Sequence, residues 1–416
     1  MLIARGFCLA VLLGVPPASM ADSIILKVAA EKQARRSTPV TWELPATLRD
    51  AEHLELSRED SGENVPVQIL RDDPPRIVWI LDGTLKAGES RRYRLTPAQK
   101  PKSQNQKSAV TCRDNGRQLV VRVGNRPVLH YNHAVVAAPN EDEAFYARSG
   151  YLHPLFAPDG QVVTDDFAPD HPHQHGVMFA WTNTTFEGRD INFWDQKAQT
   201  AKIEHVEVLD MFDGPVCGGF DVALRHIDLT APSGPKPVLD ETWSVRVYNV
   251  DDRFLFDIHS VQRCAGESPL VINQYHYGGM AIRGRREWLQ PGAGDFLTSD
   301  GKTRADGNHS RPNWVTMHGI LDDRTYYLTM FSSPHNFRAP QPVRLHPSKP
   351  YFVFAPLVLG EFQIRPSTPY ESRYRFSVRD GKLDPDRTEQ LWQDYSDPPQ
   401  VMRVESAPPS PLKDRQ

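Results

Sequence analysis

The feature that most constrains the fold is a pattern of short β-type runs along almost the whole chain. Runs rich in Val, Ile, Phe and Tyr are separated by Gly, Pro, Asn and Asp, as in "QLVVRVGNRPVLHYN" and "DETWSVRVYNV". In the first of these runs, Gly124 and Asn125 predict a hairpin. Within "RFLFDIHS", Phe254, Phe256 and Ile258 share one face, because side chains alternate along a strand. Helical periodicity is rare, and the best candidate is "DPDRTEQLWQDY", with Asp384 as its cap and Pro385 in its first turn. The pattern predicts an all-β protein.

The first residues are typical of a secretory signal peptide. Arg5 precedes the short apolar stretch "GFCLAVLLGV", and small residues then lead to an expected cleavage site after Ala21. This stretch is too short to cross a membrane, and no later segment approaches the necessary length. We therefore expect a periplasmic or secreted protein without membrane insertion. Its three remaining cysteines, Cys112, Cys217 and Cys264, lack the spacing of a disulfide framework and are expected to be buried free thiols.

Changes in composition predict the domain organisation. The polar segment "AQKPKSQNQKSA" has no periodicity and is typical of a linker between two β regions. The region after it continues without a comparable break and is too long for a seven-stranded sandwich. The expected order is a signal peptide (1–21), a small N-terminal β module (22–98), a linker (99–109), a large antiparallel β-supersandwich (110–380), and a C-terminal helix with a mobile tail (381–416).

The densest candidate for chemistry is "DHPHQHG", which places His171, His173 and His175 on the same side if it forms a strand. Pro172 indicates an edge, and the apolar "VMFAW" that follows indicates a buried continuation. Three interpretations remain open. The imidazoles could ligate a metal, could act in proton transfer or bind sugar hydroxyls, or could be hydrogen-bonded residues that hold loops at the rim.

Further polar and aromatic residues occur in clusters that could line the same face. Aromatic rings stack on the apolar faces of sugars, and Arg and His bind hydroxyls and carboxylates. We expect His171, His173 and His175 to form the catalytic centre together with Tyr275 and His276. Tyr275 or His276 is the expected catalytic base or acid. The expected substrate contacts are Trp194, Asp195, Arg283, His309, Trp314, His335 and Arg338.

Other chemistries lack their sequence signatures. The formal net charge is −4, and no stripe of Lys and Arg with interleaved aromatics is present, which argues against nucleic-acid binding. The sequence contains no GxSxG, Walker loop, dinucleotide fingerprint or CxxC. The composition therefore leaves a carbohydrate as the expected partner and requires no organic cofactor.

Four motifs resemble, in order, the bacterial family filed as "methane oxygenase PmoA-like". They are "YLHPLFAPDGQVVTDDFAPDHPHQHGVMFAWTNTTFEGRDINFWD", "YGGMAIRG", "FLTSDGK…RPNWVTMHG" and "SSPHNFRAP", and the likeness covers about residues 120 to 365. The resemblance implies an exported protein of bacteria that degrade polysaccharides, despite the family's name. Where the family usually has a second histidine, this chain has Gln174, and where it tends to have Asp-His, this chain has Ser332 and Ser333. A family metal site at those positions would be incomplete here.

A shorter likeness connects "QHGVMFAW" and "NQYHYGG" with galactose-mutarotase-like supersandwich proteins, at His175 and His276. That fold serves mutarotases, polysaccharide lyases and some phosphorylases, so it does not select a reaction. We therefore expect an exported carbohydrate-active enzyme of polysaccharide lyase, glycoside hydrolase or sugar epimerase type. The alternatives are a non-catalytic carbohydrate-binding envelope protein, or a metal-dependent oxygenase or hydrolase with the metal held by His171, His173 or His175.

Overall fold

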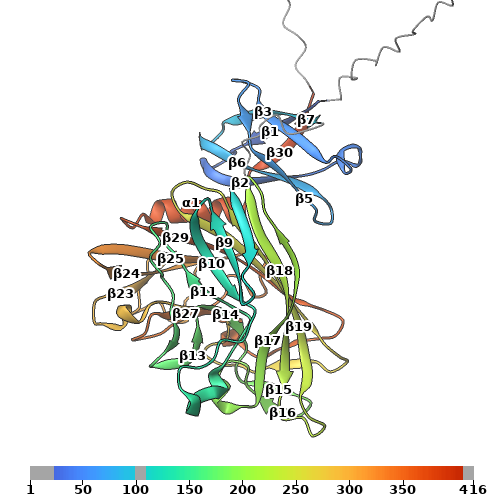
Figure 1. Ribbon diagram of the computed structural model, residues 1–416. Helices are drawn as coiled ribbons and strands as arrows, with labels where there is room; N and C mark the ends of the chain where they lie inside the picture. Colours follow the sequence, from blue (N-terminus) through green and yellow to red (C-terminus); the bar gives the residue numbers. More distant parts are fainter. Residues whose placement is uncertain (1–22, 99–108, 406–416) are drawn as a thin grey trace, which may run out of the picture.

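The computed structural model describes residues 23–98 and 109–405, which form two β modules and an α-helix that contacts both of them (Figure 1). The expected signal peptide, most of the expected linker and residues 406–416 lie outside the described residues. In the part that is described, no helix is long and apolar enough to span a membrane.

The N-terminal module packs a five-stranded sheet on a three-stranded sheet. The five-stranded sheet has the order β30 (Gln400–Val404), β1 (Ile24–Ala29), β7 (Ser90–Ala98), β3 (His53–Arg58) and β4 (Asn64–Val65). The smaller sheet has the order β2 (Arg35–Glu43), β6 (Arg76–Leu85) and β5 (Val67–Leu70). Alternating residues of both sheets, among them Leu26, Trp79, Tyr93 and Leu95, form a core that is separate from that of the large module.

The C-terminal segment departs from the prediction. A mobile tail was expected after the helix, but β30 pairs antiparallel with β1 along Gln400–Val404, so the tail prediction is wrong for these residues. Figure 1 shows this red strand beside the blue strands of the N-terminal module. The physical reason is that β1 would otherwise leave an edge of unpaired N–H and C=O groups, which β30 satisfies.

The large module is a sandwich of two eight-stranded antiparallel sheets, which confirms the predicted all-β sandwich. The first sheet has the order β26 (Val343–Leu345), β27 (Tyr351–Phe354), β22 (Gly279–Arg283), β14 (Val177–Ala180), β11 (Tyr151–Leu155), β10 (Arg126–Asn132), β9 (Gln118–Val123) and β8 (Val110–Asp114). The second has the order β17 (Ala201–Phe212), β18 (Cys217–Asp228), β19 (Lys236–Tyr248), β20 (Phe254–Cys264), β29 (Tyr370–Asp380), β25 (Arg324–Ser332), β24 (Trp314–Leu321) and β23 (Gly294–Thr298).

Alternation along these strands builds one continuous core between the two large sheets. Phe254, Phe256 and Ile258 are buried as expected, and Phe256 stacks on Phe376 of β29 with ring centroids 4.7 Å apart. The expected hairpin at Gly124 joins β9 to β10. The three cysteines of the described chain, Cys112, Cys217 and Cys264, are free, and the first two are buried.

Short elements decorate one end of this sandwich. A two-stranded sheet pairs β12 (Asp166–Ala168) with β13 (His171–His175), and a four-stranded sheet has the order β16 (Arg189–Ile191), β15 (Thr184–Phe186), β21 (Leu270–Ile272) and β28 (Phe362–Ile364). Two 3-10 turns, η2 (Glu141–Tyr146) and η3 (Gln196–Ala198), lie in the same region. These pieces position the side chains described below.

The predicted helix is present as α1 (Pro385–Ser396), and the Asp384 side chain accepts a hydrogen bond from the backbone N–H of Arg387. Its Leu391 packs on Trp314 and Phe331 of the second sheet. On the other side, buried Arg35 of the N-terminal module donates to Asp394 of α1 at 3.2 Å. The helix therefore connects the two modules.

Candidate functional site

The strand β13 places its three histidines in two different environments. His171 and His173 keep 28% and 18% of their side chains exposed, whereas His175 is fully buried. The chain turns inward at Gly176, whose φ is +30° and where a Cβ would lie 2.0 Å from the carbonyl oxygen of Leu152. Only glycine permits this close approach, and the third histidine is consequently drawn into the sandwich.

His175 has a hydrogen-bond partner at each ring nitrogen. Its Nδ1 lies 2.6 Å from Asp166, its Nε2 lies 3.0 Å from the Gln196 amide nitrogen, and Tyr151 donates to the same Asp166 at 2.6 Å. Because that amide nitrogen is a donor, Nε2 accepts and Nδ1 donates, which describes a neutral imidazole. Burial lowers the pKa of His175, although Asp166 opposes this shift. The geometry gives His175 a positioning role rather than the expected contact with a substrate.

His171 lies beside two other imidazoles. The ring of His171 lies 5.4 Å from that of His173 and 5.5 Å from that of His346, which follows β26. Burial lowers the pKa of His173 to about 4, and Asp195, 3.8 Å away, opposes this shift. Burial and then the charges of His171 and Arg344 lower the pKa of His346 to about 4. Both imidazoles are therefore neutral at pH 7.

Arg283 is placed beneath these histidines, where it supports them. Its guanidinium is 1% exposed and donates to both oxygens of Asp170, at 2.6 and 3.0 Å, and to Gln174 at 3.0 Å. Asp170 in turn lies 2.9 Å from Nδ1 of His171. Arg283, which was predicted to contact the substrate, instead holds the start of β13 in place through these hydrogen bonds.

A band of aromatic rings extends from the histidines to the predicted residues Tyr275 and His276. Trp194 is buried, with its ring 5.7 Å from Tyr351 and 5.2 Å from Tyr277. Tyr277 is 4.7 Å from His276 and 5.1 Å from Tyr275, and both of these residues are exposed. Burial, followed by the neighbouring Tyr275, raises the pKa of Tyr277 to about 12, with a smaller contribution from Asp195.

We call His171, His173, His346, Asp195 and Tyr277 the open histidine cluster. His276 borders it through Tyr277, so residues from distant parts of the sequence lie next to this cluster. His309 joins the same border, with its Nε2 3.2 Å from the backbone oxygen of His276.

Three predicted substrate contacts are placed elsewhere. Trp314 is buried under α1, where its indole donates to Glu389 at 2.8 Å. Arg338 donates to the backbone carbonyls of Pro356, Gly360 and Glu361, so it holds a loop. His335 is exposed on the turn after β25.

Sequence reasoning missed His346 and Arg344. Arg344 lies close enough to His276 and His346 to lower both of their pKa values, and its guanidinium donates to Asn308 at 3.2 Å. In residues 23–98 and 109–405 it forms no ion pair with a carboxylate. The signal was present in "VRLH", where buried Val343 and Leu345 alternate with Arg344 and His346.

In the described part of the chain, the geometry does not assemble the metal site that the sequence analysis kept as an alternative. His175 has both nitrogens occupied, so it cannot join His171 and His173 as a ligand. Among the residues that the structure describes, no group of three or more His, Cys, Asp or Glu side chains is arranged to hold a metal ion.

Comparison with curated proteins finds no match to this sequence. A family model does match, over residues 118–393, which covers most of the large module, the open histidine cluster and most of α1. Since the matched residues make up more than half of the chain, the protein belongs to the family of unknown function DUF6807.

Proposed function

We propose that the protein is a carbohydrate-active enzyme of the lyase or epimerase type, with the open histidine cluster as its active site. The observation that carries this proposal is that two neutral imidazoles, His173 and His346, both lie beside His171, while Tyr277, a phenol that retains its proton, interacts with Asp195. The Asp195 carboxylate lies 3.8 Å from His173. Neutral imidazoles accept protons and a protonated phenol donates one, so the cluster contains both partners of general acid–base catalysis.

His173 is the proposed base. It removes the proton from a sugar carbon that is activated by an adjacent carboxylate, and Asp195 stabilises the imidazolium that forms. Arg344, which has no carboxylate partner among the described residues, pairs with the substrate carboxylate and disperses the charge that develops on it. In a lyase, Tyr277 then gives its proton to the departing glycosidic oxygen as the carbon–oxygen bond breaks. In an epimerase, a proton returns to the opposite face of the same carbon.

The carboxylates at the cluster favour this chemistry over glycoside hydrolysis. Most glycoside hydrolases require two carboxyl groups that flank the scissile bond. Asp170 is engaged by Arg283 and His171, and these hydrogen bonds lower its pKa even though burial raises it. Asp195 is 37% exposed and accepts a hydrogen bond from the backbone N–H of Lys197, so among the described residues of the cluster it is the carboxylate most accessible to a substrate.

The aromatic side chains at the site are also suited to binding a sugar ring. Tyr275 and Tyr277 present ring faces next to His276 at the border of the cluster, and such faces stack on the apolar side of sugar rings. An exported location, predicted from the signal peptide, would bring the enzyme to extracellular or periplasmic polysaccharide.

The test is a panel of uronate-containing polysaccharides and free uronates incubated with the purified protein. A lyase produces the ultraviolet absorbance of an unsaturated uronate, and an epimerase incorporates deuterium from D2O at the activated carbon, detected by NMR. His173→Ala should lower the rate by at least about 100-fold. The matched control is His53→Ala in the N-terminal module, which should leave the rate unchanged.

Three results would contradict the proposal. Binding to a glycan array without product would assign a non-catalytic carbohydrate-binding protein. New reducing ends without unsaturation would assign a hydrolase. Stoichiometric metal in the purified protein, with turnover lost on its removal, would assign a metal-dependent enzyme.

A further inference from the structure

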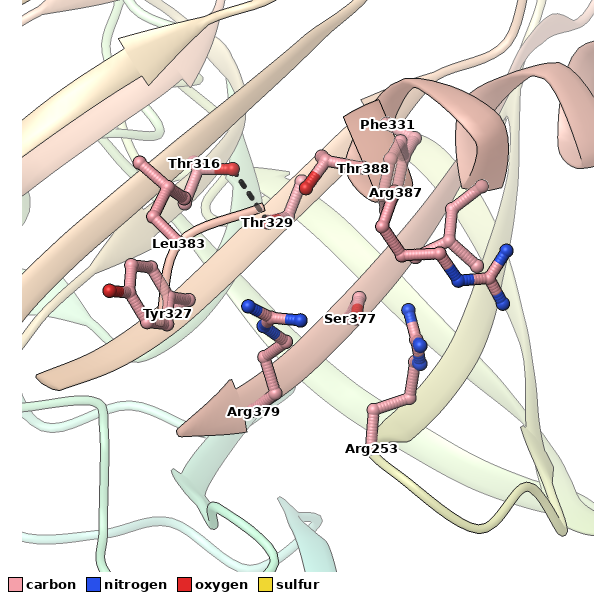
Figure 2. Close-up of a pocket in the computed structure, with 11 residues that line it drawn as sticks. Arg253, Thr316, Tyr327, Thr329, Phe331, Ser377, Arg379, Leu383, Arg387 and Thr388 are labelled. Carbon is pink, nitrogen blue, oxygen red and sulfur yellow. Dashed lines mark hydrogen bonds between the residues drawn. The ribbon is translucent and has the colours of Figure 1, made fainter. Parts of the chain in front are cut away.

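A second constellation of charged groups lies beneath α1, on the outer face of the second large sheet. Figure 2 shows this pocket, in which the guanidinium groups of Arg253 and Arg379 lie on either side of Ser377 and Arg387 descends from the helix. The hydroxyls of Thr316 and Thr329, 2.7 Å apart, form another part of the lining. The lining therefore joins three cations with several hydroxyl groups.

Positive charge exceeds negative charge in this pocket. Arg253 is 3% exposed and pairs with Asp252, but its Nη1 is buried and has no hydrogen-bond partner. Arg387 is 9% exposed and donates to Gln390 and to the backbone of Arg36, whereas its Nε is buried without a partner. Burial, followed by the charge of Arg253, lowers the pKa of Arg387 to about 10.

The third cation adds to this excess. Arg379 donates to the backbone carbonyl of Lys382 and lies over the ring of Tyr327, with its guanidinium carbon 5.4 Å from the ring centroid. Within the described chain, neither Arg379 nor Arg387 has a carboxylate at ion-pair distance. Buried donors without acceptors are costly, and an anion between them would remove that cost.

The size of the pocket selects the kind of anion. Its volume is about 10 Å³, which is room for roughly one water-sized particle. Phosphate or sulfate would need a larger space, whereas chloride is little larger than water. We infer that the structure holds a halide-sized anion site between Arg253, Arg387 and the hydroxyl groups of the second sheet. This site is independent of the open histidine cluster.

The position of the site gives the anion a structural consequence. Arg387 also donates to the backbone oxygen of Arg36, at 2.8 Å, and Gln390 donates to that of Ala34, also at 2.8 Å. The helix that covers the pocket is therefore the same one that holds the N-terminal module. An anion that binds Arg387 strengthens the docking of α1 and, through it, the junction between the two modules.

The direct test is crystallography of the full chain with bromide in place of chloride. A bromide ion should give an anomalous peak within hydrogen-bond distance of Arg253 and Arg387. Density for water without an anomalous signal would overturn the inference. Bromide peaks that occur only at exposed arginines and not in this pocket would do the same.

A solution test measures the thermal unfolding temperature in sodium chloride and in sodium gluconate at equal ionic strength. Chloride should raise this temperature by about 2 °C in a saturable manner. Arg387→Gln should abolish the chloride-specific rise, whereas the control Arg263→Gln, at an exposed arginine, should retain it. If the unsubstituted protein unfolds at the same temperature in the two salts, the proposed anion site is contradicted, whatever the variants show.

Discussion

Two groups of histidines in the large module differ in what occupies their nitrogens. In the interior, His175 is held between Asp166 and Gln196, and His226 lies 2.7 Å from Glu241. At the rim, His173 and His346 have neutral rings, and the accessible carboxylate of Asp195 lies 3.8 Å from His173. The interior histidines connect strands, whereas the rim histidines retain the capacity to exchange protons. Burial alone does not separate the two groups, because it lowers the pKa values of His173 and His175 alike.

The interior group includes a network of buried side chains on three neighbouring strands of the second large sheet. Glu241 accepts hydrogen bonds from Trp243, Ser260 and Gln262 in addition to His226, and all of these side chains are buried. Burial opposes the ionisation of Glu241, but the hydrogen bonds from His226, Ser260 and Gln262 lower its pKa overall. The buried carboxylate of Glu241 is therefore stabilised by four hydrogen bonds, and the four donors in turn have Glu241 as their acceptor.

The sharpest test of this comparison removes the centre of that network. Glu241→Ala leaves four buried donors without an acceptor, so we expect the free energy of unfolding of the large module to fall by about 3–5 kcal/mol. Urea denaturation followed by tryptophan fluorescence measures this loss. The isosteric control Glu241→Gln keeps one acceptor oxygen and should lose less. A loss below about 1 kcal/mol for the alanine variant would show that the interior histidine network is not structural.

The second test separates the two histidines of one strand. His175→Ala removes a buried ring and leaves Asp166 without its 2.6 Å partner, so the free energy of unfolding should fall by about 2–3 kcal/mol. The matched change His173→Ala should alter it by less than about 0.5 kcal/mol while it removes turnover. This reverses the simplest expectation from the alternating pattern, that all three histidines contact the substrate. If urea denaturation gives the two variants equal stabilities, the distinction between a structural His175 and a catalytic His173 is wrong.

The sequence predicted the fold more completely than the site. Strand alternation and turn residues identified the all-β sandwich, the hairpin at Gly124 and the helix capped by Asp384. The pairing of β30 with β1 was missed because it joins opposite ends of the chain, and local pattern carries no information about such contacts. The same limit explains why Trp314, which is covered by α1, resembled an available aromatic residue in the sequence.

At the site, the sequence indicated which residue types are present, but not which of their side chains are buried. The alternation of His171, His173 and His175 was visible, but the close approach at Gly176 that buries the third histidine depends on the backbone of Leu152. Arg283 resembled a substrate contact, because its bond to Asp170 spans 113 residues of sequence. His346 was missed although the alternation in "VRLH" marked it, because its contact with His171 joins distant parts of the chain.

The smallest predicted effect is a change in how the free energy of unfolding depends on pH, and it concerns His173 at the rim. The pKa of His173 is about 4 in the folded protein, below the usual value of 6.5, so the unfolded chain binds a proton between these values that the folded protein does not. The contribution of this group to stability is therefore complete above pH 6.5 and is lost as the pH falls towards 4. His173→Gln should make the dependence of the unfolding free energy on pH shallower between pH 6.5 and 4, by at most about 1.4 kcal/mol per pH unit. Urea denaturation at several pH values measures this slope. His53→Gln, in the N-terminal module, should leave it unchanged, and an unaltered slope in His173→Gln would mean that folding does not lower the pKa of His173.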